Sequence, residues 1–175
     1  GKVEGKHVLD LGCGSGISTK HLIDMGARVV GIDISEKMIE VAKSNLPDNE
    51  FFVESMDKLH FEDNTFDVVS SSLALHYMQD LSPVFNEVER VLKENGRFIF
   101  SMSHPIFDIR EKVFIEGEKE YILKPYFHNE LRKMSMFDKE MKVETYHHTF
   151  SDITNRLIDT GFVILQVVEM QPIPE

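Results

Sequence analysis

The most informative segment of the chain reads Val8-Leu9-Asp10-Leu11-Gly12-Cys13-Gly14-Ser15-Gly16. Its first four residues predict a buried strand, and the glycines after them predict a tight loop that opens a helix. Glycines in such a loop permit positive φ and let a ligand approach the backbone without meeting a Cβ. In an open α/β sheet, ligands bind beyond the carboxyl ends of the strands, which is where this loop is expected to lie. The segment therefore predicts a ligand site.

Asp33 indicates the chemistry of that ligand. It ends the next predicted strand, 17 positions after Gly16, where its carboxylate can accept hydrogen bonds from both hydroxyls of a ribose. Dinucleotide-binding loops follow the pattern G-x-G-x-x-G and hold a pyrophosphate at the helix N-terminus. Here the spacing is G-x-G-x-G, and Asp10 would repel a pyrophosphate but can hold loop amides or a cationic amino group. Asp33 and Asp10 together favour a ligand that consists of a nucleoside joined to an amino acid.

Short β-branched runs alternate with amphipathic helical stretches along the chain. The predicted strands cover residues 7–11, 28–33, 50–54, 66–73, 96–103 and 162–170. The predicted helices are one over 18–25, one capped by Ser35 and stopped by Pro47, one with Ser82 as N-cap and Pro83 as first residue that ends at Asn95-Gly96, and one capped by Ser151 and closed by Gly161. This alternation predicts an α/β fold of one domain over residues 1–175, with a doubly wound, mainly parallel sheet and helices on both faces.

Residues 105–149 break the alternation and predict a strand-rich insertion after the fifth strand, which we interpret as a lid over the ligand-binding edge. Strand-like pieces cover 120–127, 131–137 and 141–148. The insertion's apolar residues form either a hydrophobic acceptor pocket or the small core of the added strands; they include Phe107, Tyr121, Tyr126, Phe127, Met134, Met136 and Phe137. Both chain ends are expected to be truncated, because the chain enters a core strand within about six residues of its start and Pro172-Ile173-Pro174 follows the last predicted strand.

These residues resemble the class I, Rossmann-like methyltransferases that use S-adenosylmethionine, especially their small-molecule branch, from Lys6 to Met170. The resemblance implies that the glycine loop surrounds the methionine part of the cofactor and that the acid after the second strand binds the ribose. Carried over, the cofactor-binding residues are Asp10, Gly12, Cys13, Gly14, Gly16 and Asp33, with Ile34 beside the adenine and Met38 nearby. Cys13 itself is interpreted as a small packed residue of the loop, because no partner base or second cysteine can be named for a reactive thiol.

The rest of the cofactor wall departs from the family pattern. Where the family has a G-D-A-E-like stretch, this chain has Glu54-Ser55-Met56-Asp57, so the adenine contact is assigned to Met56 and Asp57, with an ordinary solvated acid as the alternative for Asp57. The resemblance further implies that Ser71, in the serine run that ends the fourth strand, borders the methionine end, and that His76 lies near the methyl donor.

Methyl transfer from a sulfonium needs alignment more than activation, so neither a covalent nucleophile nor a metal is expected. A general base helps where the acceptor must lose a proton, and histidine suits that task. The candidates are His76, His104 and His147, of which His104 and His147 rank slightly above His76 on the acceptor side. His147 and His148 are neighbours in a predicted strand and point to opposite faces, which argues against a shared metal ion.

Composition narrows the partners. The 175 residues carry 19 basic against 30 acidic side chains, a net charge of −11, which opposes binding to nucleic acid or anionic membranes and favours a small-molecule acceptor. One cysteine, no signal peptide and no spanning segment predict a cytoplasmic protein. Two alternatives stay open: a nicotinamide-dependent oxidoreductase, and a non-catalytic regulator that binds S-adenosylmethionine.

Overall fold

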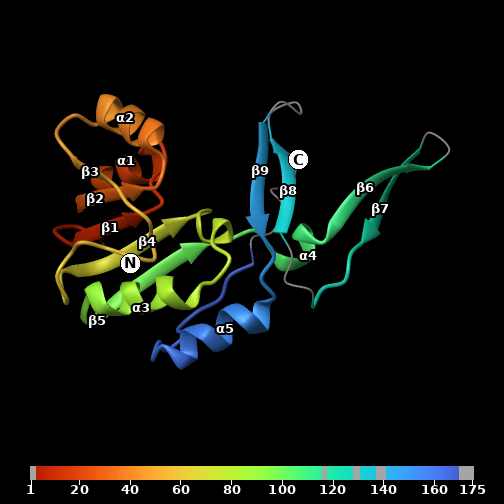
Figure 1. Ribbon diagram of the computed structural model, residues 1–175. Helices are drawn as coiled ribbons and strands as arrows, with labels where there is room; N and C mark the ends of the chain where they lie inside the picture. The colour runs from red at the N-terminus through yellow and green to blue at the C-terminus, as the bar shows by residue number, and fades with distance from the viewer. Residues whose placement is uncertain (1–2, 116–117, 128–130, 137–140, 170–175) are drawn as a thin grey trace.

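A parallel sheet forms the centre of the computed structural model, which describes residues 3–115, 118–127, 131–136 and 141–169 (Figure 1). Its five strands lie in the order β3-β2-β1-β4-β5, and every pair is parallel. The strands are β1 His7–Leu11, β2 Arg28–Asp33, β3 Glu50–Val53, β4 Phe66–Ser72 and β5 Leu92–Ser101. The strand order reverses between β1 and β4, so the predicted α/β fold with a mainly parallel sheet is confirmed, and the glycine loop lies at the reversal point.

Helices cover both faces of this sheet, as the continuous burial of β1 requires (Figure 1). Val8 packs with Val29 and Val68 against α1, whereas Leu9 packs with Val30 and Val69 against α3 and α5 on the other face. The helices are α1 Ile17–Asp24, α2 Glu36–Asn45, the 3-10 helix η1 Leu75–Tyr77, α3 Ser82–Val91, α4 Pro105–Asp108 and α5 Phe150–Asp159.

Side-chain caps begin α2 and α5, and two predicted caps are wrong. Ser35 caps α2 as predicted, since its hydroxyl accepts the Met38 N–H at 3.4 Å. Ser82 is instead the first residue of α3, whose N-cap residue Leu81 makes no side-chain cap hydrogen bond; the Ser82 N–H donates to the Asp80 carboxylate at 3.0 Å. Thr149, not Ser151, caps α5, because its hydroxyl accepts the Asp152 N–H at 3.1 Å.

β5 begins earlier than predicted and is irregular at its start. Leu92 pairs with Phe66, but the next pair joins Arg97 to Val68, so the residues between 92 and 97 bulge out of the ladder. Asn95 has a φ of 62°, which preserves a turn at the predicted Asn95-Gly96 position inside the strand's assigned bounds. The predicted start at 96 is therefore wrong, although the regular part of the strand begins at Arg97.

The predicted sixth strand over 162–170 is wrong for the described residues 162–169, which have no assigned strand. The segment nevertheless follows β5: the ring of Phe162 lies 5.9 Å from that of Phe98, and Glu169 contacts His104, just after the strand. An extended apolar sequence thus takes the expected path, but no strand ladder forms within the described part of the chain. Met170 lies outside the described residues.

The insertion after β5 is strand-rich, as predicted, and contains one strand that the sequence pattern missed. β6 Arg110–Ile115 pairs antiparallel with β7 Glu118–Leu123, and β8 Leu131–Met136 pairs antiparallel with β9 Met141–Tyr146. The β6–β7 hairpin extends away from the five-stranded sheet, whereas β9 contacts η1 (Figure 1). Phe137 and the side chains of Phe107, Tyr121, Met134 and Met136 lie outside the described residues, so the pocket interpretation stays a prediction for them. Within the described ranges, no helix is long and apolar enough to cross a membrane.

Candidate functional site

The loops after β1 and β4 meet at the reversal point of the sheet. Gly12 has a φ of 78°, and a Cβ built on it would lie 2.4 Å from Cβ of Ala74 and 3.5 Å from Cε of Met56. No side chain fits at position 12, because ordinary carbon–carbon contacts are about 3.5–4.0 Å. Gly12 therefore brings the predicted cofactor residue Met56 and the segment that leads to His76 against the glycine loop.

Gly14 and Gly16 serve different purposes. Both have positive φ, but a Cβ on Gly14 would meet no atom within 4 Å, whereas one on Gly16 would lie 3.2 Å from Cδ1 of Leu46 and 3.5 Å from Cβ of Ala42. Gly16 is the N-cap residue of α1 and permits close packing with α2. Gly14 is thus the glycine with open space in front of it, as expected where a ligand approaches the backbone.

Asp33 is partly buried at the end of β2, and each of its oxygens holds one backbone amide. Oδ2 accepts the N–H of Gly14 at 2.9 Å, and Oδ1 accepts the N–H of Ser35 at 2.9 Å. An ionised carboxylate has about four acceptor positions, so both oxygens retain capacity for a ligand's hydroxyl groups. The contact to Gly14 places that capacity beside the open space of the loop, which fits a ribose.

Asp10 is fully buried and only half satisfied. Its Oδ2 accepts the hydroxyls of Ser18 at 2.8 Å and Thr19 at 2.6 Å, rather than the loop amides considered from the sequence. Its Oδ1 is buried without a hydrogen-bond partner. Burial raises the pKa of Asp10, against the lowering effect of the two hydroxyls, and the charge of Asp33 raises it further. An orphaned acceptor of this kind fits the approach of a cationic group.

Exposed apolar side chains gather where β2 and β3 end. Ile34 is 73% exposed and Met38 42%, and Val53, which pairs with Asp33 in the sheet, is 50% exposed. Large apolar side chains left open next to a polar site can cover a flat, apolar ligand group such as an adenine. Val53 was not predicted as a site residue, because an apolar strand end carries no distinguishing sequence signal.

The third-strand motif divides into a buried and an exposed part. Met56 is half-buried against the glycine loop, whereas Asp57 is exposed, as the solvated-acid alternative requires. Glu54, which the sequence did not single out, contacts Nδ1 of His60 through Oε1 and leaves Oε2 buried without a partner. Its N–H also donates to the Asp33 carbonyl at 3.0 Å, which ties it to the candidate ribose site.

Ser71 and Cys13 are buried and already engaged. The Ser71 hydroxyl donates to the Leu11 carbonyl at 2.9 Å and so joins β4 to β1 instead of facing a ligand. Burial raises the pKa of the Cys13 thiol to about 12, with smaller contributions from the charges of Asp10 and Asp33. A thiol of this kind is unreactive at neutral pH, which supports the packing interpretation.

The three candidate bases lie in different environments. His76, in η1, is half-buried with Nδ1 unpartnered, and burial followed by the charge of His148 lowers its pKa. His104 is 48% exposed; its Nδ1 accepts the Ile106 N–H at 3.2 Å, and its Nε2 lies 3.0 Å from Oε1 of Glu169. Both nitrogens of His104 are therefore occupied.

His147 is fully buried, with Nε2 2.8 Å from the Tyr126 carbonyl and Nδ1 unpartnered. Among the described residues, no group of three or more histidine, cysteine or acidic side chains could hold a metal ion. The structure thus brings Asp10, Gly14 and Asp33 together but gives each candidate histidine a separate set of contacts.

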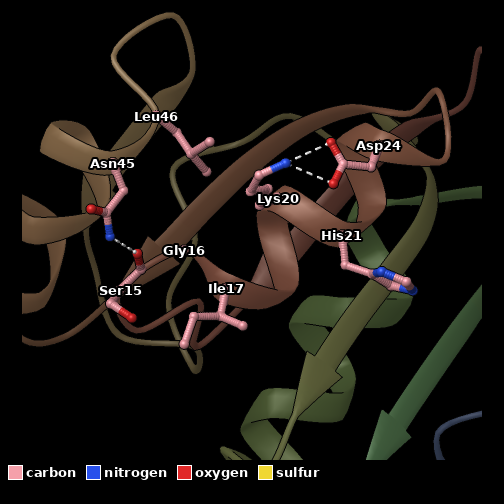
Figure 2. Close-up of a pocket in the computed structure, with 8 residues that line it drawn as sticks. All are labelled: Ser15, Gly16, Ile17, Lys20, His21, Asp24, Asn45 and Leu46. Atoms are coloured by element: carbon pink, nitrogen blue, oxygen red, sulfur yellow. Dashed lines mark hydrogen bonds and ion pairs between the residues drawn. The ribbon is translucent and has the colours of Figure 1, made fainter.

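A surface hollow of about 520 Å³ lies between α1 and α2 on the outer side of the glycine loop (Figure 2). Its rim carries the ion pair of Lys20 with Asp24 and the hydrogen bond from Asn45 to the Ser15 carbonyl at 3.0 Å. Gly16 is the one predicted cofactor residue among those that line it. The candidate cofactor site is therefore assigned to the reversal point of the sheet, where the orphaned acceptor of Asp10 and the open space in front of Gly14 lie.

The sequence was also compared with protein families and with known proteins. The family model described as a methyltransferase domain matches residues 9–100. An uncharacterized protein of Haemophilus influenzae is 32% identical, over 95% of this chain and 71% of its own length. The demethylmenaquinone methyltransferase of Renibacterium salmoninarum is 35% identical over 66% of this chain, which matches 49% of that relative.

A solved structure agrees with both sequence comparisons. The crystal structure of an S-adenosylmethionine-dependent methyltransferase from Mesorhizobium loti superposes with a TM-score of 0.83 at 34% identity, and covers 97% of this chain and 80% of its own. The segment that matches the family model contains the candidate cofactor site, from the glycine loop through β2 to η1. The chain therefore belongs to the class I S-adenosylmethionine-dependent methyltransferases.

Proposed function

We propose that this chain transfers the methyl group of S-adenosylmethionine to an apolar small molecule by in-line displacement. The observation that carries the proposal is the arrangement around Gly14: open space in front of the glycine, and next to it acceptor capacity on Asp33 and the orphaned Oδ1 of Asp10. The ribose hydroxyls would donate to Asp33 and the ammonium group to Asp10. Ile34, Met38 and Val53 would cover the adenine.

S-adenosylmethionine, when bound, supplies a methyl group on a positively charged sulfur, which needs no further activation. The chain's own contribution is to hold donor and acceptor in line and to exclude water, an effect worth up to roughly 7–11 kcal/mol. The fixed contact of Gly12 with Ala74 serves this purpose, because it keeps the donor-side loop and the loop that leads to His76 in one relative position.

His76 is the residue that we propose as general base. Its lowered pKa leaves it uncharged at neutral pH, so it can accept the acceptor's proton while the carbon–sulfur bond breaks and the bond from the acceptor to the methyl carbon forms. Such a base contributes typically about 10²–10⁴-fold. His104 and His147 are weaker candidates, since the first uses both nitrogens and the second is buried.

Exposed apolar residues on the loops after β4 and β5 support an apolar acceptor. Leu73 is 54% exposed and has a φ of 52°, an uncommon conformation that is held by hydrogen bonds from its N–H to the carbonyl and hydroxyl of Ser101. Tyr77 and Ile106 are also substantially exposed at this edge. The name of the Renibacterium relative, a demethylmenaquinone methyltransferase, agrees with such an acceptor.

The test begins with isothermal titration of S-adenosylhomocysteine, the demethylated product, into the protein. Saturable binding is expected, and its absence at millimolar ligand would refute the donor site. A panel of apolar and polar acceptors is then assayed with S-adenosylmethionine that carries a labelled methyl group. Transfer to an apolar acceptor, reduced about 10²-fold or more in His76→Gln, supports the proposal. Tight binding without transfer to any acceptor would favour the non-catalytic regulator.

A further inference from the structure

The loop from Leu73 to Ser82 connects β4 to α3 and carries His76. It is fixed at one end by Ala74, which contacts the glycine loop at Gly12. Two further anchors come from outside the five-stranded sheet: His148 reaches the Met78 carbonyl, and Arg156 reaches Asp80 and Ser82. The loop that walls the site is therefore held by one residue at the end of the insertion, His148, and by one residue of α5, Arg156.

His148 is the most deeply buried of these anchors, with a side chain that is 0% exposed. Its Nε2 lies 2.8 Å from the Met78 carbonyl, and since a carbonyl only accepts, this nitrogen carries a hydrogen. Its Nδ1 lies 3.4 Å from Oδ2 of Asp152. Both nitrogens thus face acceptors, and the protonated ring can satisfy both.

The contacts of His148 continue along α5. Asp152 and Arg156 are spaced four residues apart and lie on one face of α5, and His148 lies four residues before Asp152, just ahead of the N-cap Thr149. Asp152 accepts from Nε of Arg156 at 2.8 Å, and Nη1 of Arg156 donates to the Asp80 carboxylate. These three residues form one polar stripe that holds the loop at two points.

His76 is linked directly to the anchored carbonyl. His76 belongs to η1, and Met78 follows that helix as its C-cap residue. The turn is closed by two hydrogen bonds of 3.1 Å, from the Tyr77 N–H to the Ala74 carbonyl and from the Met78 N–H to the Leu75 carbonyl. Leu75 is fully buried in the main core. The Met78 carbonyl and His76 are thus joined through the backbone of one closed turn, so a displacement of this carbonyl is expected to reach His76.

We propose that His148 is a positioning residue for His76: by donating to the Met78 carbonyl it fixes the orientation in which His76 faces the acceptor. The inference rests on the proposed function, because it concerns the same base. It assigns a role to the end of the insertion, which reaches the catalytic loop through one buried side chain.

The charge of His148 also affects the pKa of His76. Burial and the charge that His148 carries when protonated both lower the pKa of His76. Titratable groups around this segment include Tyr77, whose ring lies 4.4 Å from that of His76, and the ion-paired Asp80, Asp152 and Arg156. β9, which contacts η1, adds Glu144 and Tyr146. Removal of the His148 charge while burial persists is therefore expected to raise the pKa of His76.

The test follows the ring nitrogens of the eight histidines by NMR in ¹⁵N-labelled protein over a range of pH. His148→Gln keeps a donor for the Met78 carbonyl but carries no charge. It should leave the high-pH signals of His76 near their wild-type positions and move its titration midpoint upward. His148→Leu lacks the donor as well and should also displace those signals. His147→Gln is the matched control, an adjacent buried histidine bonded to Tyr126 instead, and should change neither.

Unchanged His76 signals in a folded His148→Leu would overturn the inference. If His148→Leu does not fold, an unchanged titration midpoint of His76 in His148→Gln, with an unchanged fold by circular dichroism, would overturn it. An equal change in His147→Gln would overturn it too, because the effect would then be unspecific. Calorimetry with S-adenosylhomocysteine on the wild-type protein judges the proposed function separately, since a failure there leaves the NMR comparison intact.

Discussion

Substitution of Gly12 by alanine tests the contact between the two loops of the site. The substitution has two costs that the structure separates. A φ of 78° costs an alanine roughly 1–2 kcal/mol, and a Cβ placed 2.4 Å from Cβ of Ala74 adds an overpacking cost of roughly 1–3 kcal/mol. Gly14→Ala pays only the first cost, because its φ is 54° and no atom lies within 4 Å of its Cβ. We expect Gly12→Ala to lose about 2–5 kcal/mol of unfolding free energy and Gly14→Ala about 1–2 kcal/mol.

Urea denaturation of both variants measures these losses, and the double variant Gly12→Ala/Ala74→Gly isolates the steric part. Since the clash involves Cβ of residue 74, its removal should recover roughly 1–3 kcal/mol beyond the sum of the single effects. Equal losses in Gly12→Ala and Gly14→Ala, or purely additive effects in the double variant, would refute the close approach of the two loops.

Three further predictions concern charged groups. Asp33→Ala should weaken S-adenosylhomocysteine binding roughly 10- to 150-fold, the equivalent of about 1.5–3 kcal/mol, and an unchanged dissociation constant in calorimetry would contradict the ribose assignment. Burial raises the folded-state pKa of Asp10 above its ordinary 3.8, so the folded chain binds the carboxyl proton more tightly than the unfolded chain does. The contribution of Asp10 to the free energy of unfolding therefore falls as pH rises from the unfolded-state pKa through the folded-state pKa. Asp10→Asn should accordingly gain stability relative to wild type above pH of about 4, as urea denaturation across pH would show, whereas a constant difference would count against the buried charge. Arg90→Ala, which removes a guanidinium that holds the Leu59 and Phe61 carbonyls, should cost roughly 2–3 kcal/mol in urea, against less than about 1 kcal/mol for Lys20→Ala in an exposed ion pair; similar losses would show that the Arg90 contacts carry no special weight.

The five parallel strands and the contact between the glycine loop and Asp33 could be predicted from the sequence because both depend on local patterns. β1 is buried along almost its whole length, and its apolar residues mark it as an inner strand. The glycine loop follows β1 and Asp33 ends β2, so the two meet at the same edge of a parallel sheet. No long-range information was needed to place these residues together.

The remaining predictions depended on partners that are distant in sequence. The hydroxyl of Ser71 was expected in the cleft, but the neighbouring strand supplies an acceptor in the Leu11 carbonyl. The role of a histidine depends on which carbonyl or carboxylate meets each nitrogen: Tyr126 for His147, Glu169 for His104. These contacts span 21 and 65 residues, and no local pattern encodes them.

The outer edge of β5 affects how the protein behaves at high concentration. Within the described residues β5 pairs only with β4, and Ile99 on it is 55% exposed. Val163, Leu165 and Val168, in the segment that follows the same path, are at least 69% exposed. Open strand edges with apolar neighbours promote pairing between molecules, whereas a net charge of −11 keeps copies apart. Salt shortens the range of that repulsion to about 8 Å at physiological ionic strength, so colloidal stability in dilute buffer should be lost as salt is added.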